Sequence, residues 1–352
     1  MAIELSGRDA RRMRRQSQLL GGSDLAPADV VRRAVALQGQ DLPAVLQAIA
    51  IRSRPGTGVQ EVRDAFDRGE LVRGWPMRGT LFATTPEHLA ALLAFTAERI
   101  RTTAARRRAE LGLDEAVLDS GRETLRTALQ EQPLLRSEAL ELWEAAGIST
   151  ADGRGYHLLM HLSVEGLVHW GAFDPSGTQQ YLALSDARAP EDPEAALAEL
   201  VRGFVLARGP VTEADLAWWT KLPKRTVRRA ASLAGDLVEV QVEGRPAWIM
   251  GEPQIPGKSG VTLVPGFDEW ILGYADRSLV ASPAMLAALV PGNNGIFRPA
   301  VLVDGVAVGT WRWPRTSRPS RSAAEPVLDI VERVPAATRR QIERALAAWP
   351  HR

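Results

Sequence analysis

Two glutamines one residue apart, Gln38 and Gln40, form the pair of side chains whose type and spacing most suggest chemistry. A primary amide is neutral: its carbonyl oxygen accepts hydrogen bonds and its NH₂ group donates them. Such a pair cannot take up a proton as a general base does, but it can hold a water molecule, a sugar or a phosphate in place. The alternative is structural, because glutamines at a buried junction can also satisfy unpaired backbone groups.

The surrounding segment predicts a break between two helices. Apolar spacing indicates helices over 27–39 and 43–53. On one continuous helix, residues two apart point to different faces and cannot act together. Pro43 disfavours helix at the residue before it, and Gly39 loosens the end of the first helix. We therefore predict a break over 38–42.

In such a break the side chains of Gln38 and Gln40 can converge on one side. Asp41 is well placed to cap the second helix, which explains this carboxylate without a chemical role. The residues alone leave both the catalytic and the structural interpretation of the glutamines open.

Two adjacent carboxylates, Asp268 and Glu269, lie beside aromatic residues in "PGFDEWILGY". Either of them could act as a general base. Equally, Asp268 could cap the short helix that follows it. We favour the structural interpretation.

Three histidines, His157, His161 and His169, are close enough in sequence to be considered as metal ligands. The first two are four residues apart on a predicted helix, but the H-E-x-x-H pattern is absent. We interpret them as core or edge residues and expect neither a metal nor a cofactor. The chain also contains no phosphate-binding glycine loop and no G-x-S-x-G motif.

The composition is that of an ordinary globular protein with room for two or three domains. The 352 residues are 45% hydrophobic and 24% charged, and the lack of cysteine excludes disulfides and thiolate chemistry. No apolar run approaches membrane-spanning length and no signal peptide is evident, so we expect a cytoplasmic protein with no membrane partner. The net charge is only +1, yet just three of the 43 basic residues are lysines. This bias fits either a GC-rich genome or bidentate contacts to phosphate and guanine.

A unit of helices followed by a pair of strands occurs three times. We predict these domains at 1–90, 117–190 and 191–252, with a basic helical connection at 91–116. The predicted helices are 7–20, 27–39, 43–53, 59–68, 117–131, 135–146, 153–166, 193–208, 212–220 and 223–234. The predicted strands are 71–75, 79–84, 167–173, 180–185, 237–242 and 246–250. This is the order of a winged helix, so we expect an α+β fold with three tandem winged-helix units.

The last predicted domain, 253–352, is a small mixed α/β segment. "VTLVPGFDEWILGY" predicts a strand, a loop and a short helix. The pair Asp304-Gly305 predicts the turn of a hairpin. A further strand is predicted over 326–334 and a closing helix over 335–348. We expect this segment to pack against the winged-helix units.

Basic residues are concentrated in three places. On the helix within 222–235, four of them share one broad face that would lie against DNA: Lys224, Arg225, Arg228 and Arg229. The cluster at 99–110 is typical of a solvated helix. In 310–325, four arginines spaced by three predict a loop that enters a DNA groove or follows phosphates: Arg312, Arg315, Arg318 and Arg321. For each cluster the alternative is an exposed surface without a role.

Four motifs, in this order, resemble those of the AlkZ-like alkylpurine DNA glycosylases: "LQGQDLP" (37–43), "LVRGWPMRGTLFAT" (71–84), "PGFDEWILGYADRS" (265–278) and "FRPAVLVDGVAVGTW" (297–311). The resemblance runs across nearly the whole chain. It implies three tandem winged-helix units forming a concave DNA-binding face, and a catalytic Gln-x-Gln motif matched by Gln38 and Gln40. We also expect Arg78 to bind DNA. Members of the family often read "RGTLH" where this chain has "RGTLF", so any role of that histidine is absent at Phe82.

The resemblance implies hydrolysis of the N-glycosidic bond of N7-alkylguanine in double-stranded DNA. Alkylation at N7 gives guanine a positive charge, so the base leaves as a neutral group. Neutral amides then suffice to place a water molecule below C1′. We expect a monomeric, monofunctional DNA glycosylase that acts on bulky adducts or interstrand crosslinks from a DNA-alkylating natural product, in self-resistance or repair.

A second hypothesis is a non-catalytic winged-helix protein, either a DNA-binding regulator or a protein that sequesters a genotoxin. Tandem winged helices support it equally well. It predicts tight binding to undamaged DNA or to the free genotoxin, with no release of a base.

Overall fold

The computed structural model describes residues 3–186, 188–313 and 325–351. Its first elements are β1 (Ile3–Leu5), α1 (Gly7–Ser17), α2 (Pro27–Ala34), β2 (Ala36–Gln38), α3 (Leu42–Ala50), α4 (Val59–Asp67), β3 (Val72–Met77) and β4 (Thr80–Thr84). All four predicted helices and the predicted hairpin are present. The prediction of helix up to residue 39 is wrong, because α2 ends at Ala34 and a strand follows.

The central elements follow the predicted order of helices and then a strand pair. They are α5 (Pro86–Glu110), α6 (Glu115–Glu131), α7 (Arg136–Ala145), a 3₁₀ turn at Ala151–Gly153, α8 (Arg154–Val164), β5 (Val168–Phe173) and β6 (Gln180–Leu184). Next come α9 (Pro193–Arg208), α10 (Glu213–Thr220), α11 (Lys224–Leu233), β7 (Leu237–Val242) and β8 (Arg245–Met250). The helix α5 covers most of the predicted basic connection.

The carboxyl-terminal elements form a separate antiparallel sheet with helices packed on it. They are β9 (Val261–Val264), α12 (Glu269–Leu272), α13 (Pro283–Leu289), a 3₁₀ turn at Pro291–Asn293, β10 (Ala300–Val303), β11 (Val306–Arg312), β12 (Val327–Ile330) and α14 (Ala336–Ala347). The sheet has the order β12-β11-β10-β9, and the hairpin β10–β11 turns at Asp304-Gly305 as predicted. Helix α13 is an addition to the predicted elements.

The other strands join into two sheets that link distant parts of the chain. A five-stranded sheet has the order β2-β4-β3-β5-β6, so the first and second predicted hairpins pair with each other, through Arg73 and Trp170. A three-stranded sheet has the order β1-β7-β8, in which the amino-terminal strand lies parallel to β7 of the third hairpin. Each hairpin is therefore part of a larger sheet.

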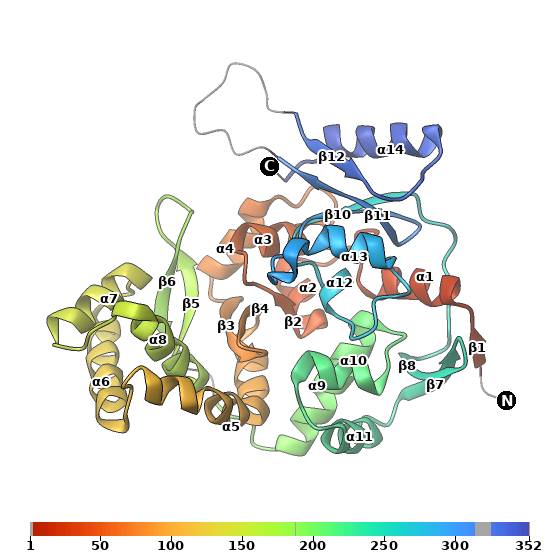
Figure 1. Ribbon diagram of the computed structural model, residues 1–352. Coiled ribbons are helices and arrows are strands. Elements are labelled where there is room, and N and C mark those ends of the chain that lie inside the picture. Colours follow the sequence, from red (N-terminus) through yellow and green to blue (C-terminus); the bar gives the residue numbers. More distant parts are fainter. Residues whose placement is uncertain (1–2, 187, 314–324, 352) are drawn as a thin grey trace.

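Figure 1 shows α6, α7 and α8 with the hairpin β5–β6 on the left, and α14 with β12 at the top. The strand β2 lies in the middle of the view, beside α12. One apolar cluster joins this region to α9 and α10, because it contains Ala36 and Phe82 as well as Phe204 and Trp219. No helix of the described residues is both long and apolar enough to cross a membrane.

Candidate active site

The two glutamines lie at the end of a short strand. Strand β2 is the edge of the five-stranded sheet, and Gln38 is paired with Phe82 of β4. Helix α2 ends at Ala34, and Val35 takes a φ of 66°, which is rare for a β-branched residue. The predicted helix break is therefore present, but it is longer than expected: it begins at Val35, contains β2 and extends to Asp41, just before α3.

A tertiary contact explains why α2 ends early. Arg208 of α9 donates from Nη1 to the carbonyl of Ala34 at 2.9 Å and from Nη2 to the carbonyl of Ala36 at 2.8 Å. The last carbonyls of a helix have no intrahelical partner, and here a buried guanidinium supplies one. Thr84 donates its hydroxyl to the carbonyl of Val35 at 2.7 Å. Hydrogen bonds from residues distant in sequence thus stabilise the backbone where it passes from α2 into β2.

Gly39, between the two glutamines, is held on both of its backbone polar groups. Its N–H donates to the carbonyl of Leu81 at 2.8 Å, and its carbonyl accepts from Nη1 of Arg73 at 3.1 Å. Burial lowers the pKa of Arg73 to about 10. A Cβ atom on Gly39 would lie 2.9 Å from the backbone nitrogen of Ala83. Only glycine lets the two backbones approach this closely.

The side chains of Gln38 and Gln40 contact adjacent residues of β4. Gln38 is buried and donates from Nε2 to the hydroxyl of Thr80 at 3.3 Å. Gln40 is exposed, and its Oε1 accepts the backbone N–H of Leu81 at 3.1 Å. The Oε1 atom of Gln38 is buried without a hydrogen-bond partner in the described part of the chain. A buried amide oxygen without a donor is unusual, and it leaves this acceptor with unused hydrogen-bonding capacity.

The capping roles predicted for two aspartates are confirmed. Asp41 accepts the backbone N–H of Ala44 at 2.9 Å at the start of α3. Asp268 accepts the backbone N–H of Trp270 at 2.8 Å at the start of α12. Asp268 also accepts from both terminal nitrogens of Arg52, at 2.8 and 2.9 Å, in a buried ion pair. Both oxygens of this carboxylate therefore accept structural hydrogen bonds.

Glu269 supports the strand that carries the glutamines. Its Oε1 accepts the backbone N–H of Gln38 at 3.2 Å. Its Oε2 accepts from Nε and Nη2 of Arg208, at 3.1 and 2.9 Å, and from the indole of Trp219 at 3.0 Å. Both oxygens are thus used, and the side chain is only 2% exposed. We interpret Glu269 as a positioning residue for Gln38, not as a general base.

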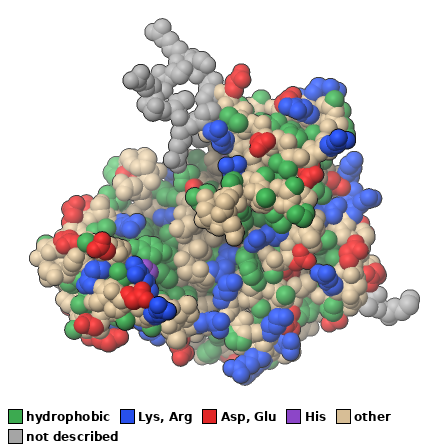
Figure 2. All heavy atoms as spheres, in the orientation of Figure 1, with side chains coloured by type: hydrophobic (Ala, Val, Ile, Leu, Met, Phe, Trp, Pro, Cys, Tyr) green, Lys and Arg blue, Asp and Glu red, His purple; other side chains and the backbone are tan. Residues whose placement is uncertain are grey.

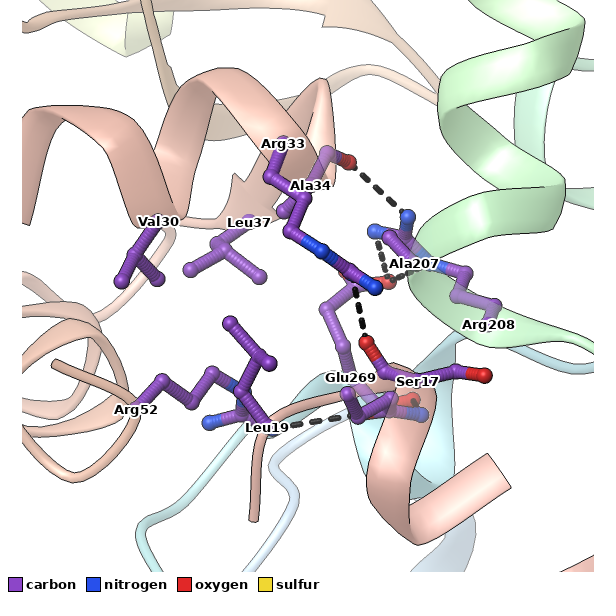
Figure 3. A pocket seen from close by; sticks show the side chains of 11 residues that line it. Ser17, Leu19, Val30, Arg33, Ala34, Leu37, Arg52, Ala207, Arg208 and Glu269 are labelled. Atoms are coloured by element: carbon purple, nitrogen blue, oxygen red, sulfur yellow. Dashed lines mark hydrogen bonds and ion pairs between the residues drawn. The ribbon is translucent and has the colours of Figure 1, made fainter. Parts of the chain in front are cut away.

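Figure 3 shows this ion pair from the side of a small internal cavity, with Arg208 reaching from α9 to Glu269 and to the backbone of Ala34. The cavity has a volume of about 10 Å³. That is room for one water molecule at most, so no nucleobase or sugar can enter it. Neither glutamine of the pair lines this cavity, and Gln40 is the exposed member of the pair.

The sequence as a whole identifies the family. A model of the AlkZ-like DNA glycosylases matches residues 31–351. The chain belongs to the AlkZ-like DNA glycosylase family. A curated relative, the interstrand DNA cross-link repair glycosylase of Streptomyces sahachiroi, is 25% identical over 307 residues and covers 81% of each chain. The structure is similar to that of the Streptomyces sahachiroi DNA glycosylase AlkZ, with a TM-score of 0.80, 23% identity and coverage of 99% of this chain and 97% of the other.

In this AlkZ-like protein the predicted DNA-binding residue Arg78 is half-buried, and its Nε and Nη2 atoms are buried. It occupies the turn between β3 and β4 together with Gly79, and both have positive φ, 56° and 69°. Its Nη1 donates to the carbonyl of Leu272 at 3.3 Å. The guanidinium carbon lies 5.0 Å from the ring centre of Phe82 and 4.7 Å from that of Trp218. Burial lowers the pKa of Arg78 to about 10.

Phe82, where AlkZ-like proteins often have histidine, is part of the core. It is fully buried and meets Trp219 edge to face, with 6.0 Å between the ring centres. Because Phe82 is the β4 partner of Gln38, the position opposite the candidate catalytic residue has no titratable group.

The four basic residues predicted to form a DNA-facing surface are all exposed on α11: Lys224, Arg225, Arg228 and Arg229. Val227 and Ala230 bury the opposite face of this helix. Arg228 pairs with Glu213, and Arg229 with Glu194. Lys and Arg side chains gather at the lower edge of the face seen in Figure 2, where α11 lies in Figure 1.

The arginines predicted to enter a groove are only partly within the described structure. Arg312 is exposed at the end of β11. Arg315, Arg318 and Arg321 lie outside the described residues.

The three histidines are not gathered around one point. His161 lies 3.1 Å from the carboxylate of Glu165, through Nε2. In residues 3–186, 188–313 and 325–351, no three His, Asp or Glu side chains are arranged to hold a metal ion.

Sequence reasoning missed Arg73 and Arg208, the two buried arginines that hold the backbone around the glutamines. Both lie in regular elements, and nothing in their neighbourhoods distinguishes them from the other arginines. Glu269 did carry a signal, as a carboxylate among aromatic residues. That signal could not distinguish a base from a buried partner of arginine.

Proposed function

We propose that the chain is a monofunctional DNA glycosylase that hydrolyses the N-glycosidic bond of N7-alkylguanine, with Gln38 and Gln40 as the catalytic residues. The observation that carries this proposal is the buried Oε1 atom of Gln38, which has no partner among the described residues. An amide oxygen held in this way can accept a hydrogen bond from the attacking water.

The rest of the site is arranged to keep that oxygen in place. The backbone of Gln38 is held by Glu269, and that of Gly39 by Leu81 and Arg73. Holding a reactant in attack geometry lowers a barrier by several kcal/mol, up to roughly 7–11 in ideal intramolecular cases. Gln40 would use its NH₂ group for a sugar or phosphate, because within the described residues only its oxygen has a hydrogen-bond partner, the N–H of Leu81.

The choice of a neutral residue fits a cationic leaving group. N7-alkylguanine departs as a neutral base, so no acid is needed to protonate it and no strong base is needed to drive the water. Unmodified guanine would leave as an anion and should stay uncleaved. Selectivity then comes largely from the lesion.

For the substrate class we propose bulky N7-guanine adducts and interstrand crosslinks from a DNA-alkylating natural product. The support is the relative from Streptomyces sahachiroi, whose name assigns it to interstrand cross-link repair. A bulky adduct does not fit a closed base pocket. We therefore expect the lesion to stay largely stacked while the enzyme works from a groove.

For DNA binding we propose that the three groups of helices and strands are winged-helix units that form a concave face. The exposed basic residues of α11, above all Lys224 and Arg225, would contact the phosphates. A helix with such a face in a winged-helix unit normally lies against DNA. We expect the protein to act as a monomer in the cytoplasm.

The test is a duplex that contains a single N7-alkylated guanine, incubated with the wild type or with the double variant Gln38→Ala, Gln40→Ala. Wild type should release the base and leave an abasic site in an uncut strand, and the double variant should not. Gln60→Ala, an exposed glutamine of α4, is the matched control.

Each of the other outcomes contradicts one part of the proposal. Full activity of the double variant would contradict the catalytic role of the two glutamines. Strand cleavage at the abasic site would contradict the assignment as a monofunctional glycosylase. Tight binding by the wild type without any base release supports the non-catalytic regulator instead.

A further inference from the structure

A cavity of about 350 Å³ lies at the tip of the hairpin β3–β4. The hairpin turn contributes Arg78 and Gly79, α5 contributes Arg99, and the end of α10 contributes Lys221. The residue after Gly79 is Thr80, whose hydroxyl holds the side chain of Gln38. The cavity therefore adjoins the candidate active site, but the mechanism does not use it.

The lining of this cavity is strongly positive. It contains three cations, and no aspartate or glutamate as far as the structure describes the chain. Burial and the positive charges of Arg78 and Arg99 together lower the pKa of Lys221. Like charges in one cavity repel each other, so the free protein stores an electrostatic cost there that a bound anion removes.

Arg78 also has hydrogen-bonding capacity that the protein leaves unused. One of its nitrogens donates to a backbone carbonyl, but Nε and Nη2 are buried without a partner among the described residues. A buried N–H of a charged group that lacks a partner has lost its hydration without gaining a hydrogen bond in return. Two adjacent guanidinium donors match two oxygens of a phosphate.

The remaining lining matches the carbon atoms of a nucleotide. Ile100 and Ala104 of α5 and Met160 of α8 are apolar, and the volume exceeds what a phosphate group alone would fill. An anion with an attached apolar ring satisfies both parts of the cavity.

We propose that this cavity binds one backbone phosphate, with its deoxyribose, of the DNA strand that carries the damaged base. The inference rests on the proposed function and assigns Arg78, Arg99 and Lys221 to it. Because Gly79 and Thr80 connect the cavity to Gln38, a phosphate held here fixes the distance between the strand and the catalytic amide. Arg78, Arg99 and Lys221 act as binding and positioning residues, and none of them touches the reacting atoms.

The test uses the two exposed cations, since replacing the half-buried Arg78 could disturb the fold. The double variant is Arg99→Gln, Lys221→Asn, where asparagine tolerates the positive φ of 61° at position 221. The control is Arg106→Gln, Lys258→Asn, which removes the same charge from exposed positions outside the cavity, one of them on the same helix. Thermal unfolding of both variants verifies that they are folded.

Binding to a duplex with one tetrahydrofuran abasic-site analogue is measured by fluorescence anisotropy over a range of salt. The double variant should bind about tenfold more weakly than the control, and the slope of log K against log salt should fall by about 1, as for one lost phosphate contact. A methylphosphonate placed at successive linkages should weaken the binding of wild type at one linkage, and should weaken the binding of the double variant less at that linkage, since only Arg78 still contacts the phosphate there. Equal affinity and slope for the double variant and the control overturn the proposal.

Two further comparisons are needed. One distinguishes a free anion from a DNA phosphate as the ligand of the cavity, and the other distinguishes failure of this inference from failure of the proposed function. If inorganic phosphate raises the melting temperature of wild type, and the double variant binds DNA as the control does, the cavity takes a free anion and the DNA assignment is wrong. If the wild type releases no base but the methylphosphonate pattern holds, the proposed function fails and the phosphate site stands. If the base is released and the pattern is absent, only this inference fails.

Discussion

The carboxylate of Glu269 accepts the backbone N–H of Gln38 at 3.2 Å, across 231 residues of sequence. The same carboxylate forms a buried ion pair with Arg208. Arg208 in turn donates to the backbone carbonyls of Ala34 and Ala36, the residues on either side of Val35. Strand β2 has only three residues and lies at a sheet edge, so these contacts are a large part of what keeps Gln38 in place.

The two glutamines should not be equivalent. Gln38→Ala removes the oxygen that is free to hold water, so we expect the single-turnover rate of base release to fall by about 100-fold. Gln40→Ala should cost less, because Oε1 of Gln40 already accepts the N–H of Leu81. The measurement is release of N7-methylguanine from a duplex at saturating enzyme, with Gln60→Ala as control. Equal losses, or a larger loss at Gln40, would contradict the assignment of the water to Gln38.

Glu269→Gln should lower the free energy of unfolding by about 3–5 kcal/mol, because it leaves the buried charge of Arg208 without its carboxylate partner. Urea denaturation measures this change. The control is Glu213→Gln, which breaks an ion pair with Arg228, a residue whose side chain is 67% exposed. That change should stay within about 1 kcal/mol. Equal losses of unfolding free energy in the two variants would show that the ion pair between Glu269 and Arg208 contributes no more to stability than an exposed pair.

Gly39→Ala should separate β2 from β4. The added Cβ would lie 2.9 Å from the backbone nitrogen of Ala83, and a backbone atom cannot move aside as a flexible side chain can. We expect a loss of about 1–3 kcal/mol in unfolding free energy, together with a fall in base release at temperatures where the variant is still folded. Gly257→Ala is the matched control, since nothing lies within 4 Å of the position of its Cβ. Normal activity in a folded Gly39→Ala protein would show that the close approach is not needed.

The stability of the second group of helices should depend on pH through Glu165. Burial opposes its ionisation, but hydrogen bonds from His161 and Arg122 lower the pKa of Glu165 to about 2. A carboxylate whose pKa is depressed in the folded state stabilises the protein above its unfolded value, about 4.3, and this stabilisation is lost as the pH falls toward 2. The urea concentration at the midpoint of unfolding should therefore decrease as the pH is lowered from 5 to 2.

The variant Glu165→Gln isolates this contribution, since other carboxylates also titrate in that range. Its urea midpoint should fall less than that of wild type over the same interval. Glu131→Gln, at an exposed position, should follow wild type. Parallel curves for Glu165→Gln and wild type would mean that Glu165 does not contribute.

Most of the secondary structure is evident from the sequence, because apolar periodicity, capping residues and turn pairs are local signals. The helices of the second and third groups differ from prediction by only a few residues at their ends, and the Asp304-Gly305 turn is where expected. The exception is the stretch before Gln38. Its apolar pattern continues past Ala34, but the helix does not, since Arg208 and Thr84 hold the last carbonyls from outside.

The sequence by itself determined the identity of the glutamine pair, the capping roles of Asp41 and Asp268, and the basic face of α11, since each depends on residue type and short-range spacing. Only the tertiary structure decided that Gln38 lies on an edge strand supported by Glu269, Arg208 and Arg73. It also decided that the oxygen of Gln38 has no partner within the described residues, and that Arg78, Arg99 and Lys221 line one cavity. The physical reason is that these contacts join residues far apart in sequence, and a buried polar group reveals its partner only when the chain is folded.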